Sequence, residues 1–318
     1  MSDNNQADLS VIKNAEEPEL IFSEDRKTLL KCTNRDITEV VIPEGIAVIG
    51  EKAFIFCQKL IRVVLPESVI KIDTMAFYNC VMLTDINLPN GLIEIGNSAF
   101  FNCKKLADVM LPDSIISIGG WAFENCSSLI SVHFPPRLTQ LGDSAFRNCS
   151  SLSNINNIPE GITQIKAYTF AQCSSLTEAI LSRGVTEIHE HAFHACTNLT
   201  NLMIPDGVTK IECAAFAQCS SLIRVSLPDS IKKIESYAFY GCSQLNCVRL
   251  PNNSELDLSF EVFKACSSLV HVTIPEKIIT LYGCYAFDGA GCEEQVKHDY
   301  SHLFELDWDS LELEDDDW

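Results

Sequence analysis

The chain has 318 residues, of which 47% are hydrophobic, and it carries a formal net charge of −20 at pH 7. This length exceeds that of most single domains, so it predicts two domains or one elongated array, and the apolar content excludes wholesale disorder. Because an acidic surface repels phosphate groups, we expect neither a nucleic-acid partner nor binding to an anionic membrane.

The first residues, MSDNNQADLSVIKNAEEPEL, contain no basic region followed by an apolar stretch, which a secretory signal requires. No later segment approaches about eighteen uninterrupted apolar residues, the length of a membrane-spanning helix. We therefore expect a cytoplasmic protein without membrane insertion, or an extracellular or surface protein if a signal peptide has been removed.

A repeat occupies most of the chain. Phenylalanine recurs every 23 or 24 residues, cysteine follows three positions later, and leucine follows three positions after that. The phenylalanines are Phe54, Phe77, Phe100, Phe123, Phe146, Phe170, Phe193, Phe216, Phe239, Phe263 and Phe287. The cysteines are Cys57, Cys80, Cys103, Cys126, Cys149, Cys173, Cys196, Cys219, Cys242 and Cys266. A fixed period of this length indicates a solenoid, in which each unit contacts only its neighbours.

One unit, LPDSIISIGGWAFENCSSLISVHF, predicts the local structure. Its Pro-Asp-Ser stretch favours a turn, and Ile115 and Ile118 point inward from a short extended segment. The Gly-Gly pair permits a corner, and one helical or 3-10 turn then buries Phe123 and Cys126. A short strand follows, with His133 on its outer face. Stacking about eleven such units predicts an α/β solenoid with a parallel sheet along it.

The landmarks of the unit SIGGWAFENCSSLISVHFP resemble those of the BspA-type leucine-rich repeat. The resemblance covers about residues 37 to 292, and it implies a curved leucine-rich repeat solenoid that binds proteins, often as an adhesin. The opening ELIFSEDRKTLLKCTNRDITEVVIPEGI resembles the hairpin that caps the first repeat of such arrays. We therefore expect an N-terminal segment and capping hairpin at 1–36, a solenoid at 37–292, and an acidic C-terminal segment at 293–318.

The segment 293–318 holds eleven acidic residues and one lysine, interspersed with large apolar residues. Two interpretations remain open. It is either an amphipathic cap that covers the end of the core or a tail that docks on a basic partner.

The cysteines of the repeat are interpreted as core residues, because cysteine beside Phe and Leu behaves as a small hydrophobe. Disulfides and metal binding are the minor alternatives. Five cysteines outside the repeat position are the better candidates for exposed or reactive thiols: Cys32, Cys213, Cys247, Cys284 and Cys292.

Three histidines in HEHAFHAC form a weak zinc candidate: His189, His191 and His194. Phe193 stands where an H-E-x-x-H motif needs its second histidine, so we favour surface histidines and predict no metal and no cofactor. The sequence contains no phosphate-binding loop, no G-x-S-x-G and no isolated pair of carboxylates. We therefore predict no enzymatic activity.

Two columns of variable residues are candidates for binding a protein partner. The outward face of the predicted strand includes Val64, Met110, His133, Ile180 and Met203. The second column follows the first inward aliphatic residue of each unit and contains Ile70, Ile93 and Ile116, then Thr139, Thr163, Thr186 and Thr209. We hypothesise that the isoleucines form an adhesive patch; alternatively, a β-branched residue is simply favoured there or another segment covers it.

The sequence thus predicts a monomeric module that recognises a protein partner without chemistry. The alternative is a secreted or surface adhesin that interacts with a host.

Overall fold

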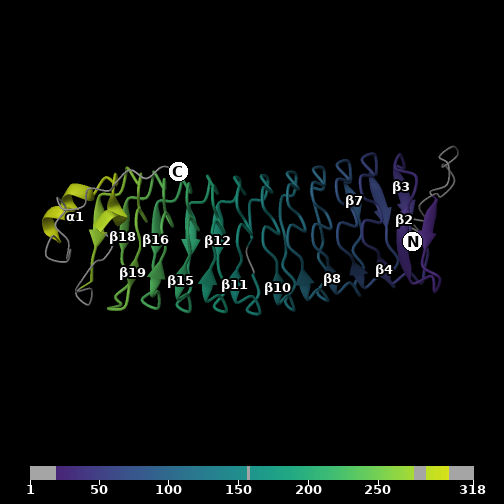
Figure 1. Cartoon of the computed structure of the whole chain (residues 1–318), viewed down its shortest axis with the longest axis horizontal. Coiled ribbons are helices and arrows are strands. Elements are labelled where there is room, and N and C mark those ends of the chain that lie inside the picture. The colour runs from purple at the N-terminus through teal and green to yellow at the C-terminus, as the bar shows by residue number, and fades with distance from the viewer. Residues whose placement is uncertain (1–18, 156–157, 276–283, 301–318) are drawn as a thin grey trace, which may run out of the picture.

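The computed structural model describes residues 19–155, 158–275 and 284–300. The chain forms an elongated β-solenoid of about eleven turns with little helix, as the sequence predicts. In the view of Figure 1 its long axis bends little. The strands of the repeats are short and parallel, and they stack along that axis.

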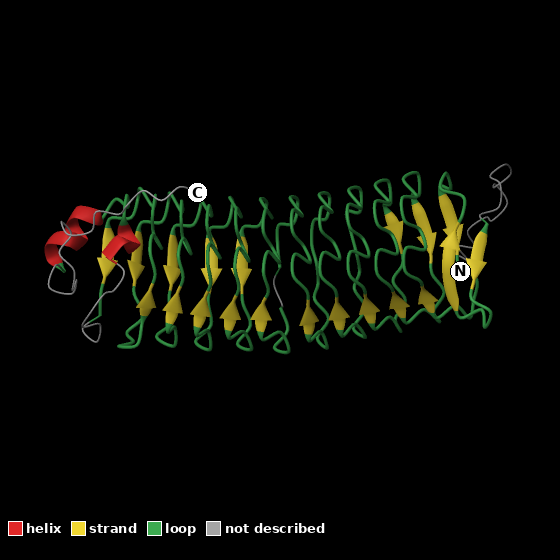
Figure 2. Cartoon of the chain, viewed as in Figure 1, coloured by secondary structure: helices red, strands yellow, loops and turns green. Residues whose placement is uncertain are grey.

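The turns of the solenoid build two ladders of strands rather than the single sheet that the sequence suggested. The first ladder comprises β3 (Glu39–Val41), β5 (Arg62–Val64) and β7 (Asp85–Ile86), then β12 (Glu178–Ile180), β14 (Asn201–Met203), β16 (Arg224–Ser226), β18 (Cys247–Arg249) and β20 (His271–Thr273). This ladder falls into two groups, from β3 to β7 and from β12 to β20, and Figure 2 shows no strand of the first ladder between them. In that interval the described residues form only the isolated bridges Ser131↔Asn154 and Asn154↔Glu178.

The second ladder runs along the whole array in two sheets. One contains the hairpin β1 (Leu20–Phe22) and β2 (Thr28–Cys32), followed by β4 (Val48–Ile49), β6 (Lys71–Ile72), β8 (Glu94–Ile95), β9 (Ser117–Ile118) and β10 (Gln140–Leu141). The other contains β11 (Gln164–Ile165), β13 (Glu187–Ile188), β15 (Lys210–Ile211), β17 (Lys233–Ile234) and β19 (Asp257–Leu258). The second inward aliphatic residue of each unit sets the register, as in the pairing of Ile95 with Ile118. A one-residue slip would expose this whole column.

The core is a continuous stack of phenylalanine rings. Neighbouring rings lie 5.1 to 5.9 Å apart between centroids, and most are tilted by about ten degrees or less. The widest spacing separates Phe146 from Phe170, and there Phe134 packs edge-on against both rings.

The cysteine ladder is buried beside these rings, which confirms its interpretation as part of the core. From Cys80 to Cys266, each thiol donates a hydrogen bond to a phenylalanine carbonyl in the preceding unit, as Cys126 Sγ does to Phe100 O at 3.2 Å. The described cysteines are free thiols. Burial raises the pKa of Cys126 to about 12, so its thiol stays protonated at neutral pH.

From Phe54 to Phe263 the segment around each repeat phenylalanine is a run of turns, not the helical or 3-10 turn expected for WAFENC. Its backbone takes left-handed values two residues before and two residues after the ring, as at Trp121 (φ 56°) and Asn125 (φ 62°). A left-handed residue cannot continue a right-handed helix, which is why the helix does not form. Asparagine tolerates this conformation, and Asn148 Nδ2 donates to Asn125 Oδ1 at 2.7 Å along the array.

The ends differ from the repeats. At the N-terminus β1 and β2 pair in antiparallel fashion, and β2 then pairs in parallel with β4. Towards the C-terminus lie the 3-10 helix η1 (Cys284–Phe287) and α1 (Glu293–Asp299), whose Val296 is buried. Most of the segment predicted as an acidic cap or tail, residues 301–318, lies outside the described residues.

Candidate partner-binding surface

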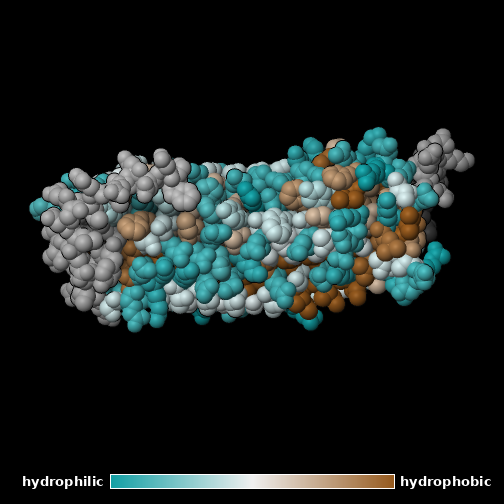
Figure 3. Space-filling model, viewed as in Figure 1, coloured by the Kyte–Doolittle hydropathy of each residue, from teal (hydrophilic) through white to brown (hydrophobic). Residues whose placement is uncertain are grey.

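The isoleucine column, defined as Ile70, Ile93 and Ile116, lies just before the strands of the second ladder. Backbone hydrogen bonds join its members, from Ile93 N to Ile70 O at 2.8 Å and from Ile116 N to Ile93 O at 2.9 Å. Successive side chains therefore stack at the spacing of neighbouring strands, about 4.8 Å. Ile70 is 45% exposed and Ile93 is 42% exposed, while Ile116 is half-buried. Figure 3 shows hydrophobic surface gathered along this edge of the N-terminal half, over the region of β4 to β10.

Threonines occupy the same position from Thr139 to Thr209, and the hydroxyl groups of Thr186 and Thr209 have partners. Thr186 Oγ1 donates to Thr163 O at 3.1 Å, and Thr209 Oγ1 donates to Thr186 O at 3.2 Å. A β-branched residue therefore suits the backbone here whether it is polar or apolar. The preference for isoleucine in the N-terminal half is not explained by the fold.

Other exposed isoleucines are scattered. Ile61, Ile130 and Ile223 occupy the corresponding position before the first ladder and are 40%, 56% and 41% exposed. They lie three and four units apart, whereas the isoleucine column is contiguous. Of these two sets, the isoleucine column presents a continuous apolar strip and the other does not.

An open groove of about 520 Å³ lies over the second ladder in the N-terminal half. It extends across β6, β8, β9, β10 and β11 and the turns that follow them, and Trp121 lines it. The volume falls within the range of small-molecule sites, about 300–1,000 Å³.

Glycines directly after the strands explain why this surface is hollow. Gly96, Gly119 and Gly142 succeed one another in neighbouring units and line the groove. A Cβ at Gly119 would stand 2.6 Å from Asn97 N, and one at Gly142 would approach the backbone of Gly120 even more closely. Only glycine fits this close approach of successive turns, so no side chains cover the ends of these strands.

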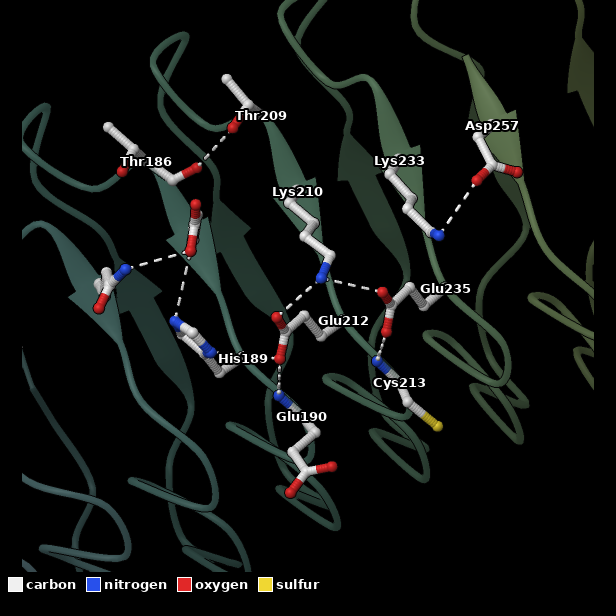
Figure 4. A network of polar contacts seen from close by, with 12 residues as sticks. Thr186, His189, Glu190, Thr209, Lys210, Glu212, Cys213, Lys233, Glu235 and Asp257 are labelled. Atoms are coloured by element: carbon white, nitrogen blue, oxygen red, sulfur yellow. Dashed lines mark hydrogen bonds and ion pairs between the residues drawn. The ribbon is translucent and has the colours of Figure 1, made fainter.

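In the C-terminal half, the position directly after the second-ladder strand is occupied by larger residues, namely Lys166, His189, Glu212 and Glu235. Figure 4 shows the resulting network, in which Lys210 Nζ contacts Glu212 Oε1 at 2.9 Å and Glu235 Oε1 at 3.0 Å. The hydrogen bonds that Lys210 donates to these carboxylates raise its pKa. Burial opposes ionisation of Glu212, but the hydrogen bond from Lys210 and the adjacent His189 outweigh it, and its pKa is lowered.

The repeats match a known family. The BspA type Leucine rich repeat region, in six copies, matches residues 30–153, 94–212 and 186–297. The chain belongs to the BspA-type leucine-rich repeat family. Among curated proteins, no sequence matches it.

Two solved structures resemble this BspA-type protein over most of its length. A leucine-rich repeat protein from Bacteroides ovatus ATCC 8483 is 25% identical, with 88% of this chain and 80% of that chain covered and a TM-score of 0.73. The pneumococcal vaccine antigen PcpA is also 25% identical, with 82% of this chain and 66% of that chain covered and a TM-score of 0.54. Neither helix in the described part of the chain has the length and hydrophobicity that crossing a membrane requires.

The predicted residues of the outward strand column lie on the first ladder of the BspA-type solenoid, apart from the isoleucine column. Met110 is 75% exposed and Met203 is 55% exposed, His133 and Ile180 are also exposed, and Val64 is half-buried. Met110 and His133 lie in the interval where the first ladder has no regular strand. The eight predicted partner-binding residues therefore belong to two surfaces rather than one.

The three histidines of the zinc candidate do not converge. His189 pairs with Glu187 and Glu212, while His191 contacts His194 edge-on and stacks on Tyr168. Burial lowers the pKa of both His191 and His194. Within residues 19–155, 158–275 and 284–300 there is no group of three His, Cys, Asp or Glu side chains that could hold a metal ion.

The cysteines outside the ladder divide into two classes. Cys213 and Cys247 are half-buried, whereas Cys32 and Cys292 are buried, so the prediction of exposure is wrong for these two. Both pack into the core cluster, because the hairpin and the segment before α1 close its ends. The side chain of Cys284 lies outside what the structure describes.

The groove and its glycines were not recognised from sequence. A signal was present at the position directly after the second-ladder strand, where glycine stands in four of the first five units, with Asp73 as the exception, and is followed by Lys166, His189, Glu212 and Glu235. This change comes one unit later than the change from isoleucine to threonine in the neighbouring column, because Thr139 and Gly142 belong to the same unit.

Proposed function

We propose that this protein is a non-enzymatic scaffold and that a protein partner docks on the isoleucine column. Its family is a family of repeat proteins that generally act as binding scaffolds. The observation that supports the proposed surface is the contiguous run of exposed Ile70 and Ile93 and half-buried Ile116, at a position where the same chain uses threonine elsewhere.

The size of the expected effect follows from the exposed area. Complete burial of an isoleucine side chain contributes about 1.5–3 kcal/mol, and Ile70 and Ile93 already bury roughly half of theirs. Burial on docking would therefore contribute about 1 kcal/mol of binding free energy per side chain. The surface would then act as a small apolar centre surrounded by a polar rim. Lys71 and Glu94, which pair at 3.2 Å beside the column, would form part of that rim.

Affinity purification with mass spectrometry from the native cell tests this proposal. The test variant carries Ile70→Thr, Ile93→Thr and Ile116→Thr, and the matched control carries Ile61→Thr, Ile130→Thr and Ile223→Thr. Both remove three isoleucines from the position that precedes a ladder, the second ladder in the test variant and the first in the control, but only the test variant loses a contiguous strip. We expect a partner that wild type and control retain and that the test variant loses. Equal recovery by both variants would contradict the isoleucine column as the docking surface.

A second candidate function is that of a surface-displayed adhesin. It is supported by the likeness to the pneumococcal vaccine antigen PcpA. Protease treatment of intact native cells, followed by immunodetection, separates this candidate from a cytoplasmic scaffold. Digestion of the protein on intact cells would support display, and complete protection until lysis would count against it.

A further inference from the structure

Among the described residues, no aromatic ring packs against the indole of Trp121. Its backbone is left-handed, as at the same position of the units from Lys52 to Glu261, and its N–H donates to Asp143 O at 2.8 Å. Trp121 stands two residues before the repeat phenylalanine. In the neighbouring units this position carries Ser98 and Ser144, which are small and buried. The indole therefore stands alone between two small residues and is 45% exposed.

Other aromatic side chains in this column do find partners. Tyr168 and His191 stack on each other with centroids 4.6 Å apart, and Tyr237 contacts Tyr240 edge-on. For Trp121 the described residues provide no such ring contact. A large flat apolar surface that is exposed at the edge of a groove is a ready platform for a ligand with an apolar face.

The groove beside the indole offers uncharged hydrogen-bonding groups. Asn97 Oδ1 accepts from Gly120 N at 2.8 Å, which fixes the amide and leaves its NH₂ group for a ligand. Gln140 Oε1 likewise accepts from Ser117 Oγ at 3.2 Å and leaves its own NH₂ group. The exposed carboxylate of Asp143 supplies acceptors on the same lining.

The charges of the groove largely cancel. Lys71 Nζ lies 3.5 Å from Asp73 and 3.2 Å from Glu94, so this ammonium group is already compensated. Lys166 and Asp143 are the further charged members of the lining. Such a surface provides no concentrated positive charge for an anionic ligand and little excess negative charge for a cationic one.

We propose that this groove binds a neutral carbohydrate of one or two sugar rings. The apolar face of a pyranose ring stacks on the Trp121 indole, while its hydroxyl groups bond to the amides of Asn97 and Gln140 and to Asp143. These partners satisfy the hydroxyl groups that binding removes from water. The groove adjoins the isoleucine column and shares Lys71 and Glu94 with its rim, but Ile70, Ile93 and Ile116 do not line it, so different variants test the two proposals.

The test uses the full chain on an array of neutral and charged oligosaccharides, followed by saturation-transfer difference NMR with the saccharide that binds. The key variant is Trp121→Ser, because Ser98 and Ser144 show that the repeat accepts serine at this position. The control is Tyr237→Ala, which removes an exposed ring from the same column outside the groove. A second variant, Gln140→Ala, leaves the indole in place and removes one ligand amide.

We expect binding of a neutral saccharide by wild type and by Tyr237→Ala with equal affinity. Affinity should fall at least about tenfold in Trp121→Ser and severalfold in Gln140→Ala, with unchanged circular dichroism spectra. Three results would overturn the proposal: no neutral saccharide binds, only charged glycans bind, or Trp121→Ser retains full affinity. Loss of a protein partner by Trp121→Ser without any saccharide binding would assign the groove to a protein interface instead.

Discussion

Thr209 donates its hydroxyl to the backbone carbonyl of Thr186 at 3.2 Å, in the column that Ile93 occupies in the N-terminal half. Because the carbonyl of Ile70 is placed equivalently below Ile93, a threonine at residue 93 should find the same acceptor. We expect Ile93→Thr to change the free energy of unfolding by less than about 1 kcal/mol, since the new hydrogen bond offsets the lost apolar contact. Urea unfolding followed by circular dichroism measures it, and a loss of several kcal/mol would mean that Ile93 belongs to the core.

Gly119 should not tolerate a side chain. A Cβ there would stand 2.6 Å from the backbone nitrogen of Asn97 and 2.7 Å from the carbonyl carbon of Gly96, and these backbone atoms cannot yield easily. We expect Gly119→Ala to destabilise the protein by about 1–3 kcal/mol. Gly91→Ala is the control, because a Cβ at Gly91 would meet nothing closer than Glu67 O at 3.6 Å. The urea unfolding midpoint of this control variant should not fall. Equal midpoints for the two variants would disprove the close approach of successive turns.

Phe123 should contribute strongly to stability because it lies in the continuous ring stack. Its centroid is 5.2 Å from those of both Phe100 and Phe146. Replacement by alanine should cost about 3–5 kcal/mol in the free energy of unfolding. Trp121→Ser, two residues away and exposed, should cost less than about 1 kcal/mol. Similar losses in both variants would indicate that the neighbouring turn, rather than the ring stack, limits stability.

The buried cysteines should make the protein less stable in alkali. Burial raises the pKa values of Cys126, Cys173 and Cys219 to about 12, whereas an unfolded thiol has a pKa of about 8.5. Their stabilising effect is therefore complete below about pH 8.5 and is lost as the pH rises towards the folded pKa, by about 1 kcal/mol per pH unit for each thiol.

Urea midpoints measured at pH 8, 9 and 10 under reducing conditions test this dependence. The midpoint should fall steeply for wild type and less steeply for Cys126→Ala, which lacks one of these titrating thiols. A slope identical in the two proteins would show that Cys126 ionises equally in the folded and unfolded states.

Most of the fold could be predicted from sequence because the repeated landmarks are also its buried residues. Phe123, Cys126 and Leu129 recur at fixed spacing since each unit must bury the same side chains against its neighbours. The second ladder was less visible, because a strand of two residues such as β9 is too short to show alternation. The turn at Asn125 was misread because asparagine serves the left-handed backbone there.

The candidate surface could be predicted only in part. The isoleucine column was visible as a departure from the repeat, and its exposure agrees with the sequence pattern. The groove was missed because a hollow depends on how closely successive turns approach at Gly119 and Gly142, which residue identity alone does not specify. Likewise, the sequence could not show that His189 lies apart from His191 and His194, because this depends on the direction of each side chain.

The most direct test of the isoleucine column is the dissociation constant of the partner, measured by calorimetry for wild type and for the two triple variants. We expect the variant at residues 70, 93 and 116 to bind about 100-fold more weakly, since three side chains each lose about 1 kcal/mol. The control at residues 61, 130 and 223 should bind as wild type does. Unchanged affinity in the first variant, or an equal loss in both, would contradict the isoleucine column as the partner-binding surface.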